Sequence, residues 1–167
     1  MRLLGAGFLW ISLIYLGATY STKLKRRIIL IEKTIMMFEE FKVQLGFLNL
    51  PVFEMLCATG QKEYLKELDY IDICCNELKD GKDFPDAWYF SVNSTLQPYK
   101  REEKERLLQL GENLGISGTE NQISYLNLQI KSFQDIYENA KHQQISYGNM
   151  ITLLSAMAGC IIFILVI

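Results

Sequence analysis

The chain has 167 residues, half of them hydrophobic, and a formal net charge of −2. This length suits one folded domain and leaves little room for a second. Because the chain lacks an excess of positive charge, the common classes of nucleic-acid-binding protein are excluded, and we expect no nucleic acid among its partners. Only three prolines occur, which favours long helices.

The first predicted element is an uncharged apolar stretch from Leu3 to Thr22. Arg2 precedes it, whereas four basic residues follow it closely: Lys23, Lys25, Arg26 and Arg27. A cleaved signal peptide carries its basic charge before the apolar core, so this arrangement favours a transmembrane segment over residues 1–22. A weak cleavage sequence at residues 19–21 keeps the signal peptide as an alternative. Because basic flanks stay in the cytoplasm, we expect the N-terminus outside and residue 23 onward inside the cell.

Helical periodicity continues from Ile28 to Val43, where apolar residues return every three or four positions. The apolar residues of this stripe include Ile28, Ile31, Ile35 and Phe38. We therefore expect the first apolar stretch to run into this helix with little interruption. Gly46 and Asn49 are expected to end it.

Four shorter helices are predicted in the middle of the chain, where Pro and Gly separate the periodic segments. They cover Pro51 to Cys57, Lys62 to Lys79, a short segment opened by Pro85, and Lys100 to Asn113. Gly60 is expected to end the first of them, and residues 80–83 are expected to form a turn. A glycosylation sequon at residues 93–95 is interpreted as a chance match, because we place it in the cytoplasm.

The last predicted helix begins after three glycines, Gly111, Gly115 and Gly118. Thr119 and Gln122 have the spacing of a capping box, in which each side chain bonds a backbone donor of the new helix. From residue 123 to residue 140, apolar residues alternate by three and four positions, which predicts a seam for packing against other helices. No proline follows, so we expect this helix to continue to the C-terminus.

The final stretch, Gln143 to Ile167, contains no charged residue. From Met150 it is almost wholly apolar, over about 18 residues, the length at which a helix begins to span a bilayer. We predict a second transmembrane segment over residues 147–167; a buried core helix is the alternative. Ser155 and Gly159 have small-x-x-x-small spacing, which permits close approach of another helix, and are our candidates for membrane-helix packing.

These elements predict an all-α fold, an antiparallel bundle of about six helices whose first and last helices extend as transmembrane segments. Residues 23–146 would form a cytoplasmic helical bundle domain between the segments 1–22 and 147–167. No strand pattern persists anywhere in the sequence.

The sequence contains no arrangement typical of catalysis. His142 is the only histidine, and no cluster of metal ligands accompanies it. Nothing identifies a serine for a Ser-His-acid triad, and no glycine-rich phosphate loop occurs. We therefore expect no enzyme activity, no cofactor and no small-molecule substrate. A small membrane-bound enzyme that uses scattered Ser, Glu or Tyr groups is the alternative hypothesis.

The four cysteines form no Cys-x-x-Cys pair. They are Cys57, Cys74, Cys75 and Cys160. We interpret them as small hydrophobic residues in a reducing compartment rather than as a disulfide framework.

The charged run from Lys100 to Arg106 mixes both signs at helical spacing. Its simplest interpretation is a solvated helix face with weak ion pairs. The alternative is a docking face for a cytoplasmic partner.

The layout resembles stage III sporulation protein AB, a small membrane protein of endospore-forming bacteria. The stretch from Leu110 to Gln122 resembles that family's Leu-Gly-x-x-Leu-Gly-x-Ser-Asp, followed by a glutamine and a long helix. Residues 84–88 resemble its acidic-Ala-Trp sequence after a glycine turn. The apolar opening and the closing tail are similar as well, so the resemblance covers essentially the whole chain.

Two positions depart from the family pattern. Gly118 stands where the family has Asp, so the helix cap there is expected to use Ser117 or Thr119 instead. Ser155 stands where the family has Gly, and the basic residue often found near the start of the last span is missing.

The resemblance implies a cytoplasmic helical bundle similar to the platform proteins of type II secretion and type IV pilus systems. It implies a non-enzymatic platform or assembly component of a secretion-like channel needed for endospore formation. The implied partners are a cytoplasmic secretion-type ATPase and other membrane components of the sporulation channel. The implied location is the mother-cell membrane around the forespore, with two membrane passes and the central domain in the cytoplasm.

Two alternative functions remain open. One is a helical membrane-anchored signalling adaptor, whose seam at residues 123–140 would pair with a partner's coiled coil. The other is a platform component of a secretion or pilus system outside sporulation.

Overall fold

The computed structural model describes the backbone of residues 2–48, 50–95 and 97–166. It describes the side chains of residues 19, 21–48, 50–95, 97–147, 150, 154 and 157. Within these ranges every regular element is helical, which confirms the all-α prediction.

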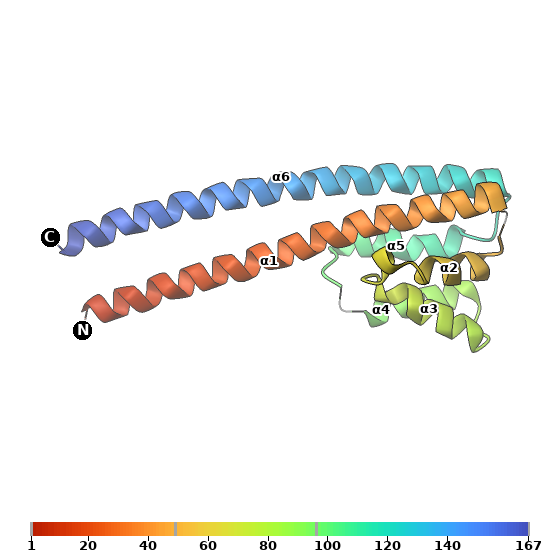
Figure 1. Ribbon diagram of the computed structural model, residues 1–167, viewed down its shortest axis with the longest axis horizontal. Coiled ribbons are helices and arrows are strands. Elements are labelled where there is room, and N and C mark those ends of the chain that lie inside the picture. Colours follow the sequence, from red (N-terminus) through yellow and green to blue (C-terminus); the bar gives the residue numbers. More distant parts are fainter. Residues whose placement is uncertain (1, 49, 96, 167) are drawn as a thin grey trace. The chain divides into compact units, whose positions relative to one another are not determined.

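The described residues form six α-helices and two short helical turns, which follow one another in chain order (Figure 1). The helices are α1 (Arg2–Val43), α2 (Val52–Gly60), α3 (Asp69–Lys79), α4 (Phe84–Ser94), α5 (Arg101–Asn113) and α6 (Thr119–Val166). A π-helical turn, η1 (Gln44–Leu48), follows α1, and a 3₁₀ turn, η2 (Glu63–Leu65), precedes α3. The continuity of α1 and of α6 confirms that each predicted end segment runs into the neighbouring helix without a break.

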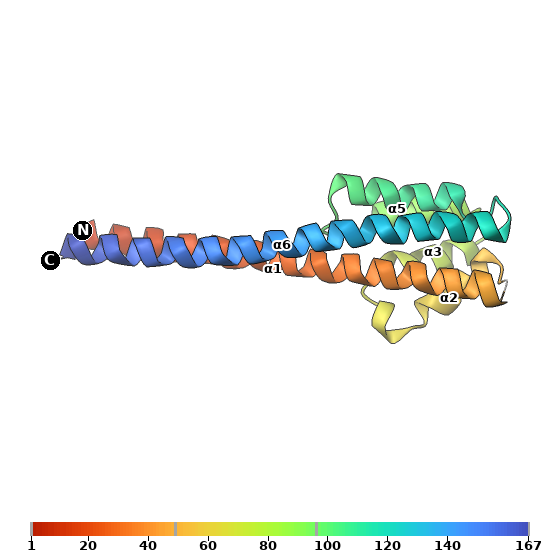
Figure 2. The same ribbon diagram turned by 90° about the horizontal axis from the view of Figure 1, so that it is seen from above.

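The chain divides into two compact units, which we name the terminal unit and the helical body. The terminal unit comprises Met1–Ile28 and Glu138–Ile167, and the helical body comprises Ile29–Tyr137. In the terminal unit, the first part of α1 and the last part of α6 run in opposite directions. The start of α1 and the end of α6 therefore lie at the same end of this unit (Figures 1 and 2).

The predicted transmembrane segments fall within the terminal unit. Most side chains of residues 1–22 and 147–167, including those of Ser155 and Gly159, lie outside the described residues. In the part of the chain that could be assessed, no helix has an apolar stretch long enough to cross a membrane.

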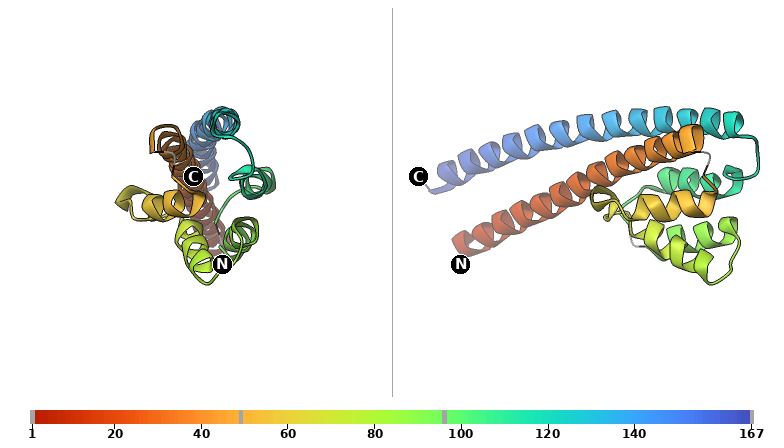
Figure 3. Two further views of the ribbon diagram at one scale, coloured as in Figure 1. Left: turned by 90° about the vertical axis from the view of Figure 1, so that its right-hand side faces the viewer. Right: turned by 45° about the vertical axis from the view of Figure 1, so that its right-hand side comes forward.

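The helical body is built around large buried aromatic side chains. Phe38 of α1 meets Phe133 of α6 edge to face, with ring centroids 5.4 Å apart, and Tyr70 of α3 meets Trp88 of α4 in the same way at 5.5 Å. Such pairs add about 1 kcal/mol each to the apolar surface that they remove from water. Figure 3 shows the helices of the body grouped around this common interior.

The sequential helices α2, α3, α4 and α5 pack on their neighbours in chain order, α2 on α3, α3 on α4 and α4 on α5. Pro85 lies in the first turn of α4, as predicted, where its missing N–H costs no helical hydrogen bond. Gly81 has a φ of +91° in the turn before α4, a conformation that favours glycine.

A polar group inside the body connects α1 to the segment before α5. Thr34 Oγ1 lies 2.7 Å from the hydroxyl of Tyr99 and donates to the backbone oxygen of Leu30 at 2.8 Å. Burial raises the pKa of Tyr70 to about 12 and also raises the pKa of Tyr99. Both hydroxyls therefore stay protonated, and the group supports the packing without introducing charge.

Two sequence predictions about the body need correction. The helix predicted from Lys62 to Lys79 begins at Asp69, because the chain first makes the turn η2. Leu65 and Leu68 are fully buried, as the apolar pattern suggested, but Leu65 reaches the core from a 3₁₀ turn and Leu68 from the non-helical residue just before α3. Burial of these two leucines, rather than helical propensity, sets the local conformation.

The second correction concerns the cysteines. Cys57 of α2 and Cys75 of α3 form a disulfide, with their Cα atoms 5.6 Å apart, so the prediction that neither joins a disulfide was wrong. The packing of α2 on α3 brings together two residues 18 positions apart, a proximity that their spacing does not reveal. Cys74 is free and buried.

Candidate interaction surface

The helical body has a shallow open pocket of about 470 Å³ on its surface, between α1 and η2. Ile35 and Met36 supply its apolar lining, and Tyr64 of η2 forms one wall. The remaining lining residues are charged: Lys33, Glu39 and Glu40. An apolar floor with a charged rim is the pattern of a protein contact surface rather than of an enclosed ligand site.

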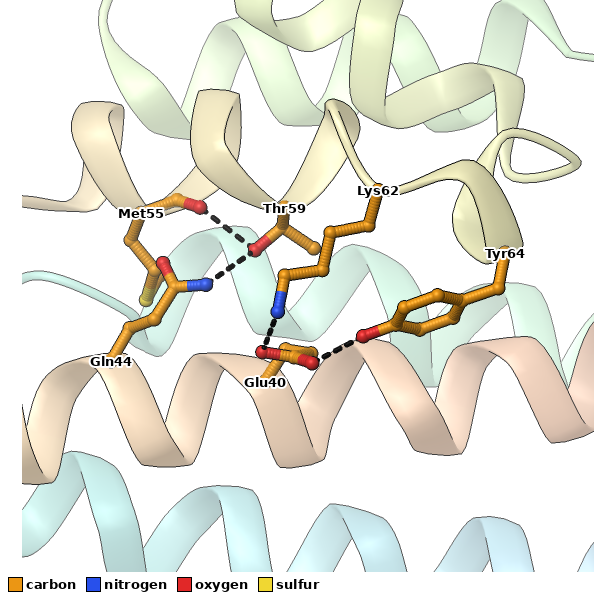
Figure 4. Close-up of polar contacts among 6 residues, drawn as sticks. All are labelled: Glu40, Gln44, Met55, Thr59, Lys62 and Tyr64. Atoms are coloured by element: carbon orange, nitrogen blue, oxygen red, sulfur yellow. Dashed lines mark hydrogen bonds and ion pairs between the residues drawn. The ribbon is translucent and has the colours of Figure 1, made fainter.

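One wall of this pocket is held by a cluster of polar contacts centred on Glu40 (Figure 4). Lys62 forms an ion pair with the Glu40 carboxylate at 2.5 Å, and the Tyr64 hydroxyl donates to the same carboxylate. Partial burial opposes ionisation of Glu40, but the hydrogen bonds from Lys62 and Tyr64 outweigh it and lower the pKa of this carboxyl. The cluster therefore ties α1 to η2 through a carboxylate that is charged at neutral pH.

A second polar contact lies next to this cluster, where α1 gives way to η1. Gln44 Nε2 donates to Thr59 Oγ1 at 3.2 Å, and Thr59 Oγ1 donates to the backbone oxygen of Met55 at 2.8 Å (Figure 4). Gln44 and Thr59 are buried. These bonds fix the π-helical turn on α2, so the loop that follows is anchored at its base.

In the described part of the chain, no three His, Cys, Asp or Glu side chains gather closely enough to hold a metal ion. His142 is exposed on α6. Burial raises the pKa of the Cys74 thiol to about 12, which leaves it a poor nucleophile. The prediction that the chain is not an enzyme stays a prediction.

The predicted seam on α6 lies inside the helical body over much of its length. Leu126, Ile130 and Phe133 are buried there. The charged run at the start of α5 is largely a solvated face, because Arg101 pairs with Glu105 at 2.7 Å and Arg106 with Glu102 at 3.2 Å, one helical turn apart.

One member of the charged run behaves differently. Glu103 is buried and accepts a 2.7 Å hydrogen bond from the backbone N–H of Lys100. A carboxylate at the third position of a helix can accept a hydrogen bond from the backbone N–H of the residue just before the helix. This bond satisfies a donor that would otherwise lack a partner at the helix start. The sequence contained the signal, an acidic residue at this spacing, but the pattern of alternating charges concealed it.

The glycine-rich stretch between α5 and α6 forms a defined loop. Gly115 has a φ of +84°, and Gln122 of α6 reaches back over the loop. The Gln122 side chain accepts a hydrogen bond from Gly115 N at 3.0 Å and donates to Ser117 O at 2.5 Å. The predicted capping box required the Gln122 side chain to accept from the backbone N–H of Thr119. It instead accepts from the backbone N–H of Gly115, four residues earlier in the chain. The first turn of α6 uses Gly118 O, which accepts from Asn121 N and Gln122 N.

Gly111, the first glycine of the same stretch, lies at a close contact between α5 and α4. A Cβ atom at this position would lie 2.7 Å from Cδ1 of Trp88, closer than atoms of real side chains approach. Trp88 is fully buried and donates from Nε1 to the backbone oxygen of Leu107 at 2.6 Å. The glycine therefore lets α4 and α5 approach closely around one tryptophan, which connects the two motifs at residues 84–88 and 110–122.

The family model of stage III sporulation protein AB matches residues 2–167. The chain belongs to the stage III sporulation protein AB family. No curated protein and no solved structure gives a significant match. The match covers the terminal unit as well as the helical body, so the family assignment applies to the whole chain.

For this family member, the motifs that carry the resemblance are structural. Gly111 and Trp88 set the contact between α4 and α5, while Gly115 and Gln122 shape the loop before α6. Sequence reasoning did not identify the pocket beside Tyr64, nor the exposure of the apolar residues Phe47, Leu48 and Ile116. Exposure depends on how the helices pack, and short apolar segments between helices gave no periodic signal.

Proposed function

We propose that this chain is a non-enzymatic membrane platform, or assembly component, of a secretion-like channel between mother cell and forespore. The observation that carries the proposal is the family match over essentially the whole chain. The all-α body, with an open charged-rimmed pocket among its described residues, supports a role in protein contacts.

The proposed location is the mother-cell membrane around the forespore. Residues 1–22 and 147–167 would cross the membrane, and the central part of the chain would lie in the cytoplasm. The support comes from the sequence: two uncharged apolar ends and a basic cluster directly after the first. Ser155 and Gly159 would then allow close packing of the last segment against another membrane helix.

The proposed partners are a cytoplasmic secretion-type ATPase and other membrane components of the channel. Co-purification of the full chain with that ATPase from detergent tests this partnership. We expect a stable complex of the two folded proteins. Persistent failure to associate, with both proteins folded, would argue against the platform role.

The disulfide between Cys57 and Cys75 bears on the proposed location, because disulfides are uncommon in the cytoplasm. In a cytoplasmic body, the reducing thiol pool would open this disulfide, so the proposed location predicts that Cys57 and Cys75 are neighbouring free thiols in living cells. Trapping free thiols with a maleimide in sporulating cells measures this directly. A fully oxidised pair in the native protein would favour an extracytoplasmic body.

The signalling-adaptor alternative required a free seam on α6. Leu126 and Phe133 are fully buried in the helical body, so that part of the seam is not available to a partner's coiled coil. Crosslinking along residues 123–137 separates the two functions: crosslinks within the chain support the platform, and crosslinks to another protein support the adaptor.

A further inference from the structure

Three large apolar side chains project into solvent at one end of the helical body. Phe47 is 86% exposed, Leu48 62% and Ile116 74%; we name these three residues the apolar tip. Phe47 and Leu48 belong to η1, and Ile116 to the loop between α5 and α6. Figures 1 and 3 show that these two segments lie at the same end of the body. Three such exposed residues together are characteristic of a binding surface.

Both segments of the apolar tip pack against neighbouring helices at this end of the body. A Cβ on Gly115 would lie 3.1 Å from Val52 at the start of α2, and a Cβ on Gly46 would lie 3.4 Å from Ile123 of α6. Phe47 and Ile116 each follow directly on one of these glycines. The tip therefore presents two exposed segments at the same end of the body.

Buried side chains hold both segments in place. Gln122 bonds Gly115 N and Ser117 O on either side of Ile116, and Gln44 anchors the start of η1 to Thr59. A π-helical turn is rare and frequently marks a functional position. Because these bonds hold the tip in place before binding, ordering it on binding would cost little conformational entropy.

The charges around the tip are negative on balance, because Lys42 at the end of α1 is paired with Glu39. Residues 43–61 and 107–130 contain no Lys or Arg, and their acidic residues are Glu54, Glu112 and Glu120. All three carboxylates are exposed. The turn between α3 and α4 lies at the same end of the body, and its Lys79 and Lys82 are balanced by Asp80 and Asp83. The surroundings of the tip are therefore acidic.

We propose that the apolar tip docks the helical body onto a protein partner that has an apolar socket bordered by Lys and Arg. An acidic surround repels nucleic acid and anionic lipid headgroups, which excludes both as occupants. A second copy of the chain is also disfavoured, because a symmetric contact would bring like carboxylates together. Resting on the proposed function, this inference assigns the socket to the secretion-type ATPase.

The test compares two leucines of equal exposure in the full chain. Leu48→Ser alters the tip, and Leu128→Ser alters α6, where Leu128 is 63% exposed and lies outside the tip. Affinity for the purified secretion-type ATPase is measured in detergent by biolayer interferometry. We expect Leu48→Ser to weaken binding about tenfold and Leu128→Ser to leave it unchanged. Binding should also weaken with rising salt, because charged borders are screened.

Ile116→Ser, in the other segment, is the second tip variant, and thermal unfolding by circular dichroism confirms that each variant is folded. Wild-type binding that neither tip variant weakens would overturn the docking surface and leave the proposed function standing. A folded wild-type chain that does not bind the ATPase would overturn both. Loss of self-association in Leu48→Ser with unchanged ATPase binding would show that the tip joins copies of the chain, which also overturns the inference.

Discussion

The substitution Gly111→Ala tests the packing that underlies the family motif. The added methyl group would lie 2.7 Å from Trp88 Cδ1 and 3.1 Å from Cβ and Cγ of the same residue. Trp88 has little freedom to move, because its indole N–H is bonded to Leu107 O and its ring packs against Tyr70 and Phe84. We therefore expect α4 and α5 to be forced apart.

The magnitude follows from three contributions. Overpacking a filled core costs about 2–3 kcal/mol, and loss of the indole hydrogen bond costs about 1 kcal/mol. The intrinsic helix preference of Ala over Gly returns about 1 kcal/mol. The net destabilisation is about 2–3 kcal/mol, equivalent to a decrease in melting temperature of roughly 5–10 °C for a chain of this size.

The assay is thermal unfolding of the full chain in detergent, followed by circular dichroism at the helical band. Gly118→Ala is the control, because a Cβ at Gly118 meets nothing within 4 Å. We expect the control to unfold within about 2 °C of the wild type. A Gly111→Ala protein as stable as the control would refute the argument that this glycine exists to admit Trp88.

Three further predictions concern the polar and thiol groups of the body. The lowered pKa of the Glu40 carboxyl stabilises the fold at pH values above the carboxyl's ordinary pKa, and this contribution is lost as the pH falls through the folded-state pKa. Lys62→Met should therefore reduce the pH dependence of the free energy of unfolding near pH 4, measured by chemical denaturation. The expected change is less than about 1 kcal/mol, because the ion pair is partly exposed. An unchanged pH profile would show that the pair contributes nothing. In oxidised protein, reduction of the Cys57–Cys75 disulfide should lower the free energy of unfolding by about 3 kcal/mol, because the bond closes a loop of 18 residues. Urea unfolding with and without dithiothreitol measures this difference. Equal unfolding midpoints would contradict the prediction. Cys74, whose pKa is raised to about 12 by burial, should react with iodoacetamide only after unfolding. Rapid labelling of the native Cys57→Ser/Cys75→Ser/Cys160→Ser protein, in which Cys74 is the remaining thiol, would show that the site is open to solvent.

Much of the helical layout could be predicted from the sequence. Long periodic stretches without proline predicted α1 and α6, and Pro85 and Gly81 marked the boundary between α3 and α4. These signals are local, because a helix start or a left-handed turn depends on the residues at that position. The family motif at residues 110–122 was identified as well, although its spacing gave no hint that Gly111 faces Trp88.

The failures have a common physical cause. Leu65 and Leu68 fitted a helical stripe, yet tertiary burial holds Leu65 in a 3₁₀ turn and Leu68 in a non-helical conformation before α3. Cys57 and Cys75 are separated by 18 residues, and only the packing of α2 on α3 brings their Cα atoms within 5.6 Å. The sequence predicted that Glu103 is a solvated charge, but at the start of α5 its carboxylate is buried and accepts a hydrogen bond from the backbone N–H of Lys100.

The candidate interaction surfaces were the least predictable feature. Met36 and Tyr64 share one pocket although they lie far apart in the chain, and Phe47 and Ile116 share one end of the body. No periodicity connects such residues, because their proximity follows from the order in which the helices return. A sequence shows that a residue is apolar, but the packed structure shows whether it remains exposed.

The central claim is that two apolar ends anchor a cytoplasmic helical body at a membrane. Topology mapping with paired cytoplasmic and extracytoplasmic reporters, fused after Thr22, near Gly81 and at Ile167, tests it most directly. The account predicts cytoplasmic signals after Thr22 and near Gly81 and an extracytoplasmic signal at Ile167. An N-terminal segment that is cleaved, with the Gly81 reporter active outside the cell, would contradict it.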